Sequence, residues 1–458
     1  MTGGRVGGSF RDPSGFVFRR DGRILRQVNP VYREDYDALL SSGLHEELLS
    51  EGLIVPHVEM GLEQAYSAEA YRVLAPEPVP FVSYPYEWCF GQLRHAALAT
   101  LEIQSRALAR GLTLKDASAF NIQFPDGRPV LIDTLSFERH VDGKPWIAYG
   151  QFCQHFLAPL LLMSRVDIRL GRLLERYLDG IPLDLASRLL PRTTWARFGT
   201  LLHVHLHAMS QRRFANRPLE ASRLERAVST TGLRALISSL EGAVRRLRWE
   251  PEGTEWADYT TSHGYSDEDE TAKRAAVQSR LNTLRPAVVW DLGANTGEYS
   301  RLASEGGARV VALDGDPAAV ERAYRAMRSD GSRILPLWID LTNPSPSTGW
   351  ALRERLSLVE RGPADLVLAL ALVHHLAISN NVPLEDVARF LAELAPSVLI
   401  EFVPKDDPQA QRLLASRPDI FPDYTREGFE RAFREFFKVR EVLPVGASGR
   451  VIYDLARR

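Results

Sequence analysis

From residue 286 onward, the sequence alternates short apolar runs with longer segments of helical spacing. Strands that alternate with helices are joined by crossover connections, so they form a mainly parallel sheet with helices on both faces. This pattern leaves few other folds open, and it predicts an α/β, Rossmann-like domain over residues 286–458. The seven expected strands are 287–290, 309–313, 333–338, 365–371, 397–402, 439–444 and 450–454.

A glycine-containing loop, Asp291-Leu-Gly-Ala-Asn-Thr-Gly297, directly follows the first expected strand. Gly293 and Gly297 let the backbone turn tightly and let a ligand approach it without a Cβ in the way. The dinucleotide-binding fingerprint also needs glycine where this chain has Asn295 and Glu298. The loop therefore predicts a ligand site but disfavours a nicotinamide cofactor.

Acidic residues close the second and third expected strands. The second strand runs into Asp314-Gly-Asp316, where a ribose diol would need a bidentate acceptor, and Asp340 closes the third. Ligands of open parallel sheets bind beyond the carboxyl ends of the strands. The loop and these carboxylates are therefore expected at one edge of the sheet.

This ordered series resembles the class I methyltransferases that use S-adenosylmethionine, over about residues 286–458. The resemblance implies a seven-stranded sheet whose last strand, 450–454, runs antiparallel to the others. The cofactor carries a sulfonium and no phosphate, so its site needs carboxylates and backbone groups instead of a lysine-bearing phosphate loop. The implied contacts are Asp291 at the start of the loop, Gly293, Ala294, Asn295 and Gly297 for the methionine part, Asp314 for the ribose, and Asp340 and Leu341 for the adenine.

The fourth expected strand leads into His374 and His375, at the sheet edge that faces the methyl donor. Similar methyltransferases often have a base or an orienting histidine in this loop, and a histidine can remove the proton of an attacking hydroxyl. Either histidine is a candidate base, or it caps the next helix or fills the core. Glu401, at the end of the fifth strand, is a second candidate base or a satisfied strand-end carboxylate.

Two tyrosines, Tyr259 and Tyr265, lie in an aromatic and acidic stretch upstream of the domain. In similar enzymes an N-terminal segment folds over the cofactor, and aromatic rings attract a sulfonium through cation–π interaction. The alternative is that these rings pack on the sheet. We expect a linker or lid over residues 249–285.

The first half, over residues 14–248, has strand-like runs early and helical spacing late, which predicts an α+β domain. Its run from Leu114 to Asn121, followed by a short strand that ends at Asp133, resembles the catalytic loop of kinase-like and aminoglycoside-phosphotransferase-like proteins. The resemblance implies that Asp116 orients an acceptor hydroxyl and that Asn121 and Asp133 hold magnesium with ATP.

The first half also departs from that family. It has no Gly-rich phosphate loop in its early hairpin, and Arg26 is the nearest cation to the position of the nucleotide lysine. Thr134-Leu135 stands where a kinase has Phe-Gly. Three interpretations stay open: a degenerate kinase-like module, an active phosphotransferase, and no relation to kinases.

Composition limits the partners and the compartment. The formal net charge is -2, from 56 basic and 58 acidic side chains, so bulk electrostatics does not favour nucleic acid. Cys89 and Cys153 are too few for a disulfide framework, which favours the reducing cytoplasm. No apolar run approaches the roughly 18 residues of a membrane span. We expect a flexible start over residues 1–13.

The sequence thus predicts a two-domain methyltransferase that uses S-adenosylmethionine. The expected acceptor is a small molecule or a saccharide hydroxyl, with a protein side chain as an alternative. Two other hypotheses stay open. One is a kinase-like phosphotransferase with a regulatory methyltransferase domain, and the other is a non-catalytic scaffold of two degenerate enzyme folds.

Overall fold

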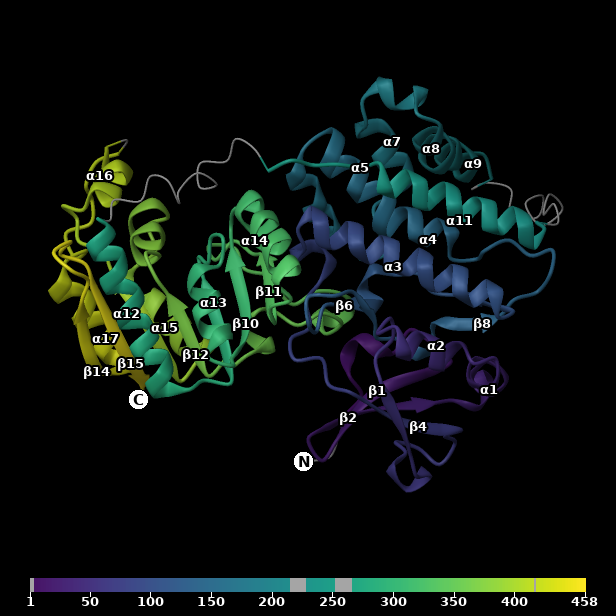
Figure 1. Ribbon diagram of the computed structural model, residues 1–458, viewed down its shortest axis with the longest axis horizontal. Coiled ribbons are helices and arrows are strands. Elements are labelled where there is room, and N and C mark those ends of the chain that lie inside the picture. The colour runs from purple at the N-terminus through teal and green to yellow at the C-terminus, as the bar shows by residue number, and fades with distance from the viewer. Residues whose placement is uncertain (1–3, 215–227, 252–265, 416) are drawn as a thin grey trace. The chain divides into compact units, whose positions relative to one another are not determined.

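The computed structural model describes residues 4–214, 228–251, 266–415 and 417–458 (Figure 1). By its internal contacts the chain divides into two compact units. Unit 1 comprises Met1–Glu250 and Ser347–Arg355, and unit 2 comprises Pro251–Pro346 and Leu356–Arg458. The segment Ser347–Arg355 therefore belongs to unit 1, although it lies within the second half of the sequence. The sequence predicted a single boundary between the two domains, at one linker, and did not predict that this later segment packs in unit 1.

Unit 2 is built on a seven-stranded sheet with the strand order β11-β10-β9-β12-β13-β15-β14. β15 pairs antiparallel with both of its neighbours, and the other pairings are parallel. The predicted Rossmann-like architecture is confirmed, and the single reversed strand is β15. The strands are β9 (Val288–Leu292), β10 (Arg309–Asp314), β11 (Ile334–Trp338), β12 (Leu366–Ala369), β13 (Ser397–Phe402), β14 (Phe437–Pro444) and β15 (Val451–Arg457).

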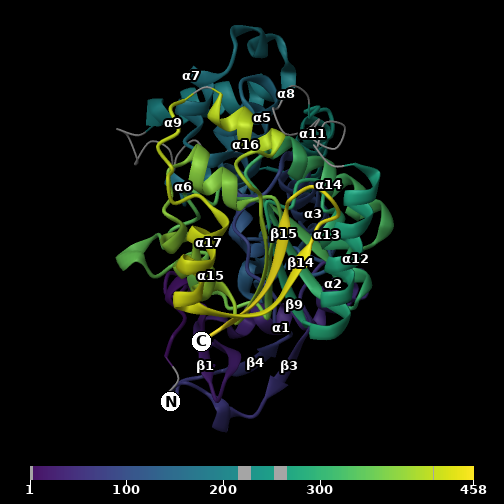
Figure 2. The same ribbon diagram turned by 90° about the vertical axis from the view of Figure 1, so that its left-hand side faces the viewer.

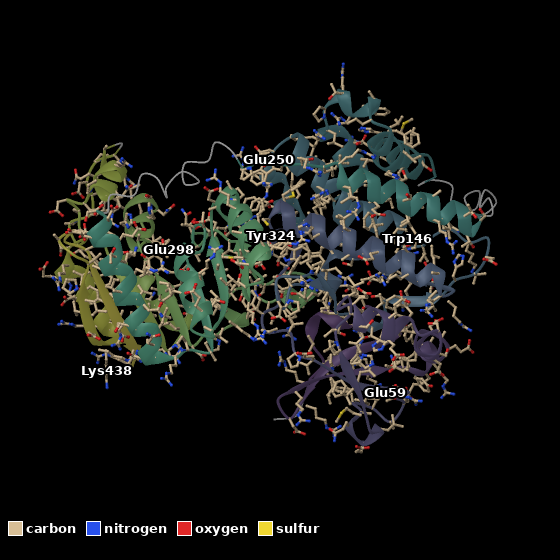
Figure 3. The ribbon with its side chains drawn as sticks, viewed as in Figure 1. Glu59, Trp146, Glu250, Glu298, Tyr324 and Lys438 are labelled. Carbon is tan, nitrogen blue, oxygen red and sulfur yellow. The ribbon has the colours of Figure 1, made fainter. Side chains whose placement is uncertain are left out.

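Helices cover both faces of this sheet. Figure 2 shows α12, α13 and α14 on one side of the strands and α15 and α17 on the other. Buried side chains such as Val289, Val310 and Leu368 join the strands to the helices in one apolar core. Figure 3 labels Glu298 at the start of α13 and Tyr324 on α14. The helices are α12 (Asp267–Leu284), α13 (Glu298–Glu305), α14 (Pro317–Asp330), α15 (Leu384–Leu394), α16 (Pro408–Leu414) and α17 (Arg426–Phe436).

The helix α12 replaces much of the linker or lid expected over 249–285. Asp269 in its first turn accepts a backbone N–H from the turn between β14 and β15 at 2.8 Å. Arg280 pairs with Asp454, whose side chain is fully buried. These contacts hold α12 against the edge of the sheet. Its acidic first turn and few buried apolar residues give the sequence of this helix the composition of a linker.

Unit 1 begins with a four-stranded antiparallel sheet in the order β1-β2-β4-β3. Its first hairpin turns at Asp21 and Gly22, which both have positive φ angles of 49° and 77°, as a tight two-residue turn requires. Two smaller pairs, β5 with β8 and β6 with β7, follow. The strands are β1 (Gly15–Arg20), β2 (Arg23–Val28), β3 (His57–Met60), β4 (Arg72–Pro76), β5 (Leu112–Leu114), β6 (Ile122–Gln123), β7 (Val130–Leu131) and β8 (Phe137–Arg139).

Most of unit 1 after its first sheet is helical, as the spacing predicts. The long helix α3 packs against α11 and is buried over most of its length. Within the described residues, every helix of the chain is too short or too polar to span a bilayer. The helices are α1 (Arg33–Ser41), α2 (Leu44–Ser50), α3 (Phe90–Ala109), α4 (Tyr149–Phe152), α5 (Ala158–Arg165), α6 (Leu173–Arg176), α7 (Leu183–Leu189), α8 (Phe198–Thr200), α9 (His207–Phe214) and α11 (Thr230–Arg245).

Residues 1–3 of the flexible segment expected over 1–13 lie outside the described residues, and residues from Gly4 on make backbone contacts with β1. The N–H of Val6 donates to the carbonyl of Val17 at 2.9 Å, and the N–H of Arg19 donates to the carbonyl of Gly4 at 3.1 Å. From Gly4 on, the chain therefore lies along β1 as an added edge. These partners are distant in sequence, so local composition does not reveal them.

Candidate functional site

The loop after β9 is shaped by residues with left-handed backbone conformations. Gly293 and Gly297 have φ angles of 72° and 83°, and Asn295 has a φ of 50°. A Cβ at position 297 would lie 2.3 Å from the Met327 side chain, and one at position 293 would lie 3.3 Å from that of Leu372. The loop therefore needs glycine at both positions, as the sequence predicts.

Two carboxylates lie beside this loop, a buried one at Asp291 and a half-buried one at Asp314. Asp314 accepts the backbone N–H groups of Asn295 at 2.7 Å and Asp316 at 2.8 Å. Asp291 accepts the hydroxyl of Ser300 at 2.6 Å. Burial raises the pKa of both Asp291 and Asp314 to about 6. Both groups are therefore mainly charged at neutral pH.

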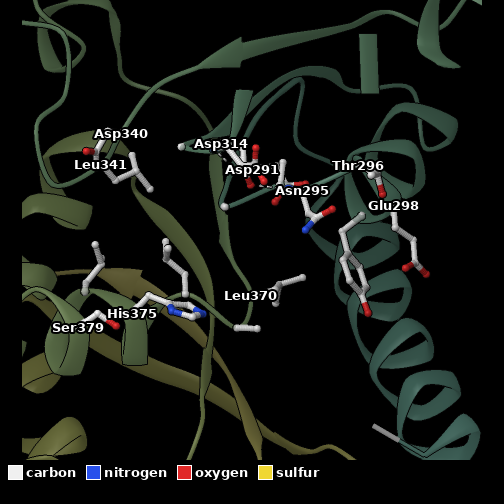
Figure 4. A pocket seen from close by; sticks show the side chains of 18 of the residues that line it. Asp291, Asn295, Thr296, Glu298, Asp314, Asp340, Leu341, Leu370, His375 and Ser379 are labelled. Atoms are coloured by element: carbon white, nitrogen blue, oxygen red, sulfur yellow. Dashed lines mark hydrogen bonds between the residues drawn. The ribbon is translucent and has the colours of Figure 1, made fainter. Parts of the chain in front are cut away.

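These residues line a pocket of about 460 Å³ at the carboxyl ends of the strands (Figure 4). That volume is within the range of small-molecule sites. Figure 4 shows Asp291, Asn295 and Asp314 close together, Asp340 and Leu341 beyond Asp314, and His375 below. The lining combines the predicted residues Asp291, Gly293, Ala294, Asn295, Asp314, Asp340, Leu341 and His375 with Glu270, Lys273, Thr296, Glu298, Tyr299, Gly315, Asp316, Thr342, Leu370, Ala371, Leu372, Leu376, Ser379 and Asn380.

The chemistry of this pocket fits S-adenosylmethionine. Asp314 uses one lone pair of each oxygen for a backbone N–H, so both oxygens can still accept a ribose hydroxyl. Carboxylates from three strand ends favour a cationic ligand, since Asp291, Asp314 and Asp340 all line the pocket. The glycine at position 293 leaves its backbone open to a ligand. The pocket has the donor set that a sulfonium cofactor without phosphate needs.

The structure separates the two candidate histidines. His375 lines the pocket, whereas the His374 side chain is fully buried outside it. Burial and the nearby Arg450 lower the pKa of His375 to about 4, so its imidazole is neutral at pH 7 and a weaker base than a free imidazole. Burial also lowers the pKa of His374, and neither of its ring nitrogens has a hydrogen-bond partner among the described residues.

Glu401 lies behind the wall of the pocket and not in it. Its fully buried carboxylate accepts the backbone N–H of Ala371 at 2.9 Å and pairs with the ammonium of Lys273 at 2.8 Å. Lys273 comes from α12 and lines the pocket, and its ammonium lies 5.0 Å from the ring centre of Tyr299. Glu401 thus acts on the pocket through Lys273.

Some predicted contacts lie elsewhere. Gly297 does not line the pocket. It is the N-cap residue of α13, at the end of the loop. Tyr259 and Tyr265 lie outside the described residues. The sequence analysis missed Lys273 and Tyr299 as pocket residues. The signal for Lys273 was the Ser266-to-Asp269 capping pattern, which marks the start of a helix.

In unit 1, the predicted metal residues are engaged by protein groups. Arg26 pairs with Asp133 at 2.6 Å, and only 11% and 15% of the two side chains are exposed. Asp116 accepts the side-chain amide of Gln151 at 2.8 Å, and Asn121 donates to the hydroxyl of Ser136 at 3.3 Å. A guanidinium therefore lies against the carboxylate to which the resemblance assigns magnesium.

No cluster of three or more histidine, cysteine or acidic side chains suited to a metal ion occurs in the described part of either unit.

No protein-family model matches the chain. The chain is 36% identical to the nodulation protein NoeA of Rhizobium meliloti (strain 1021), over 99% of this chain and 96% of that protein.

It belongs to the NoeA family.

Solved structures are similar to parts of this NoeA-family chain. The PH0226 protein of Pyrococcus horikoshii OT3 is 17% identical over 45% of this chain and 100% of that one, with a TM-score of 0.33. The bifunctional kinase-methyltransferase WbdD is 16% identical over 46% of this chain and 45% of that one, with a TM-score of 0.31.

Proposed function

We propose that unit 2 of this NoeA-family protein transfers a methyl group from S-adenosylmethionine to an acceptor hydroxyl, with His375 as the general base. The observation that carries the proposal is one pocket that combines the Gly293 turn, the Asp314 carboxylate and a neutral histidine. When bound, the cofactor would supply a methyl group activated by a sulfonium, and cleavage of the sulfur–methyl bond would leave the electron pair on sulfur as a neutral thioether. The side chains and backbone of the pocket bind and position the reactants and accept the proton.

Each pocket residue has a binding role in this proposal. Asp314 accepts the two ribose hydroxyls, and the open backbone at Gly293 and Ala294 contacts the methionine part. Asp340 and Leu341 contact the adenine. Because donor and acceptor are held side by side, positioning supplies much of the rate acceleration.

His375 accepts the proton of the acceptor hydroxyl on a ring nitrogen, which leaves the oxygen able to form its new bond to carbon. Its neutral form at pH 7 follows from its lowered pKa. The side chain of Asn380 donates to the carbonyl of His375 at 2.9 Å and so fixes the backbone that carries the imidazole. Glu401 has a positioning role, since its carboxylate holds Lys273 at the pocket wall.

The acceptor is a small molecule or a saccharide with a free hydroxyl. The pocket is a confined space lined by Ser379 and Asn380, which offer neutral hydrogen-bonding groups beside His375. Because the NoeA relative is a nodulation protein, we place this chain in the same process. Both cysteines are buried free thiols, which supports a reducing compartment such as the cytoplasm.

For unit 1 we propose a degenerate kinase-like module that presents the acceptor. The pairing of Arg26 with Asp133 supports this over an active phosphotransferase, because a metal would have to displace a buried guanidinium. The alternative, a phosphotransferase with a regulatory methyltransferase domain, requires magnesium-dependent phosphoryl transfer by the full chain.

The test is methyl transfer by the full chain. The protein is incubated with methyl-labelled S-adenosylmethionine and fractions of a cell extract, beside the His375→Ala variant as a matched control. We expect label in a small-molecule or saccharide fraction, and little label with the variant. Label in the protein fraction would indicate that the acceptor is a protein side chain. No label in any fraction, together with no binding of the cofactor, would overturn the proposal.

A further inference from the structure

The segment Ser347–Arg355 forms a closed loop within unit 1, shown in green in Figure 1. Its two ends pair with each other. The N–H of Thr348 donates to the carbonyl of Arg355 at 3.1 Å, and the N–H of Arg355 donates to the carbonyl of Thr348 at 3.2 Å. The loop is therefore a compact element with its own backbone closure, and its side chains make specific contacts in unit 1.

Arg355 extends from this loop into an aromatic cluster. Its guanidinium carbon lies 4.2 Å from the ring centre of Phe120. The rings of Tyr84 and Tyr86 lie 6.3 and 6.4 Å from that of Phe120, and both tyrosines are buried. Aromatic faces attract a guanidinium by cation–π interaction, which strengthens as water is removed. Phe120 directly precedes Asn121, in the loop that resembles a kinase catalytic loop.

Two further contacts hold the same loop. The Glu354 carboxylate accepts two bonds from the guanidinium of Arg11, at 2.7 and 3.0 Å, and only 4% of the Glu354 side chain is exposed. Gly7 and Gly8 pack directly against the loop: an added Cβ would lie 2.0 Å from the carbonyl oxygen of Arg353 or 2.6 Å from that of Glu354. These contacts explain the ordered, glycine-rich start of the chain.

We propose that Tyr84, Tyr86 and Phe120 form a guanidinium-binding site in unit 1, that Arg355 fills it as a latch, and that the latch is coupled to cofactor binding in unit 2. The coupling part rests on the proposed function. Asp340, Leu341 and Thr342 line the cofactor pocket, and only the four residues Asn-Pro-Ser-Pro connect them to the loop. Two prolines make this connection stiff, so release of the loop loosens the pocket wall.

The physical link at the pocket end is a turn held by Asp340, whose carboxylate accepts the N–H and the hydroxyl of Thr342 at 2.8 and 2.7 Å. Because this turn lines the pocket, cofactor binding costs less conformational entropy when the latch already holds the chain beyond it. By reciprocity, a bound cofactor also stabilises the latch.

The experiment measures hydrogen exchange and cofactor affinity in the full chain with Arg355→Ala. We expect faster exchange in the peptides that contain Phe120 and residues 347–355, and S-adenosylmethionine affinity about fivefold weaker. Methylguanidinium at low millimolar concentration should restore slow exchange, whereas methylammonium should not. The control Arg353→Ala removes an exposed arginine two positions away and should change neither readout.

A second variant keeps the test independent of Arg355 itself. Gly7→Ala should release the loop by a steric clash and give the same exchange pattern, while Gly4→Ala, which has no atom within 4 Å of an added Cβ, should not. Unchanged exchange at Phe120 in Arg355→Ala, or no rescue by methylguanidinium, would overturn the binding site. Faster exchange with unchanged cofactor affinity would overturn the coupling. If the wild type binds no cofactor, the proposed function fails, while exchange and rescue still decide the guanidinium site.

Discussion

Both units present a carboxylate at the end of a strand beside a loop with a family-like motif, and the two carboxylates differ in their partners. In unit 2, Asp314 accepts two backbone N–H bonds, and no lysine or arginine pairs with it among the described residues. In unit 1, Asp133 is paired with Arg26 at 2.6 Å. The first keeps its charge for a ligand, and the second is neutralised by the chain.

This difference teaches that a motif alone does not make a site. Asp116, Asn121 and Asp133 have kinase-like spacing, yet each is engaged by another side chain of unit 1. In unit 2, Asp291 and Asp314 are held by backbone and hydroxyl donors, which position them without cancelling their charge. The presence of an internal counter-ion distinguishes the two cases.

The largest effect is expected from His375→Ala in unit 2. A general base contributes about 10²–10⁴-fold to turnover, mainly in the transition state. We therefore expect turnover to fall by that factor while S-adenosylmethionine affinity stays near the wild-type value, measured by initial rates and calorimetry. His374→Ala serves as the matched control and should not change the proton transfer. Normal turnover in His375→Ala would place the base elsewhere.

The next effect is expected from Asp314→Ala. A charge-assisted hydrogen bond contributes about 1.5–3 kcal/mol, so S-adenosylmethionine should bind about ten to a hundredfold more weakly. Gly293→Val should weaken binding further, because its side chain blocks the backbone and strains a positive φ. Titration calorimetry on folded variants checks both. Wild-type affinity in both variants would remove the cofactor site from this pocket.

A smaller effect is expected from pH. The carboxyl of Asp314 has a pKa of about 6 in the folded protein and accepts hydroxyls as a carboxylate. The affinity for S-adenosylmethionine is therefore highest above pH 7, where Asp314 is charged. It falls as the pH drops through 6, by about tenfold between pH 7 and pH 5. The Asp314→Asn variant should lose the part of this dependence that comes from Asp314, and Asp291, whose pKa is also about 6, accounts for the remainder. A wild-type affinity that rises toward pH 5 would contradict the assigned role.

The smallest effect on function is expected from Asp133→Asn in unit 1. Arg26 then loses its carboxylate partner, so the unfolding free energy of unit 1 should fall by about 1–3 kcal/mol. S-adenosylmethionine affinity should not change. Differential scanning calorimetry measures the first, and titration measures the second. A loss of magnesium-dependent phosphoryl transfer in this variant would restore the phosphotransferase hypothesis.

The sequence predicted the sheet of unit 2 well, because a strand buried on both faces is a continuous apolar run. The expected run 397–402 is β13 (Ser397–Phe402), and 309–313 differs from β10 only at its last residue. The sequence also placed Asp314 and Gly293 at the pocket, because their positions depend on local backbone geometry at strand ends. Local features of this kind are readable from one chain.

Features that depend on distant partners were not predicted. Residues 267–284 have the composition of a linker. They become α12 because Lys273 and Arg280 pair with β13 and β15, and Asp269 bonds the turn between β14 and β15. The local sequence also gives no signal that Ser347–Arg355 packs in unit 1. The choice between His374 and His375 likewise needs the fold, because burial separates two adjacent residues.

The most direct measurement is a titration of the full chain with S-adenosylmethionine and, separately, with magnesium ATP, in the wild type, Asp314→Asn and Asp133→Asn. We predict one cofactor bound per chain, weaker binding only in Asp314→Asn, and no heat from magnesium ATP in any of the three proteins. Cofactor affinity that is insensitive to Asp314→Asn, or nucleotide binding that Asp133→Asn abolishes, would contradict the contrast between the two carboxylates.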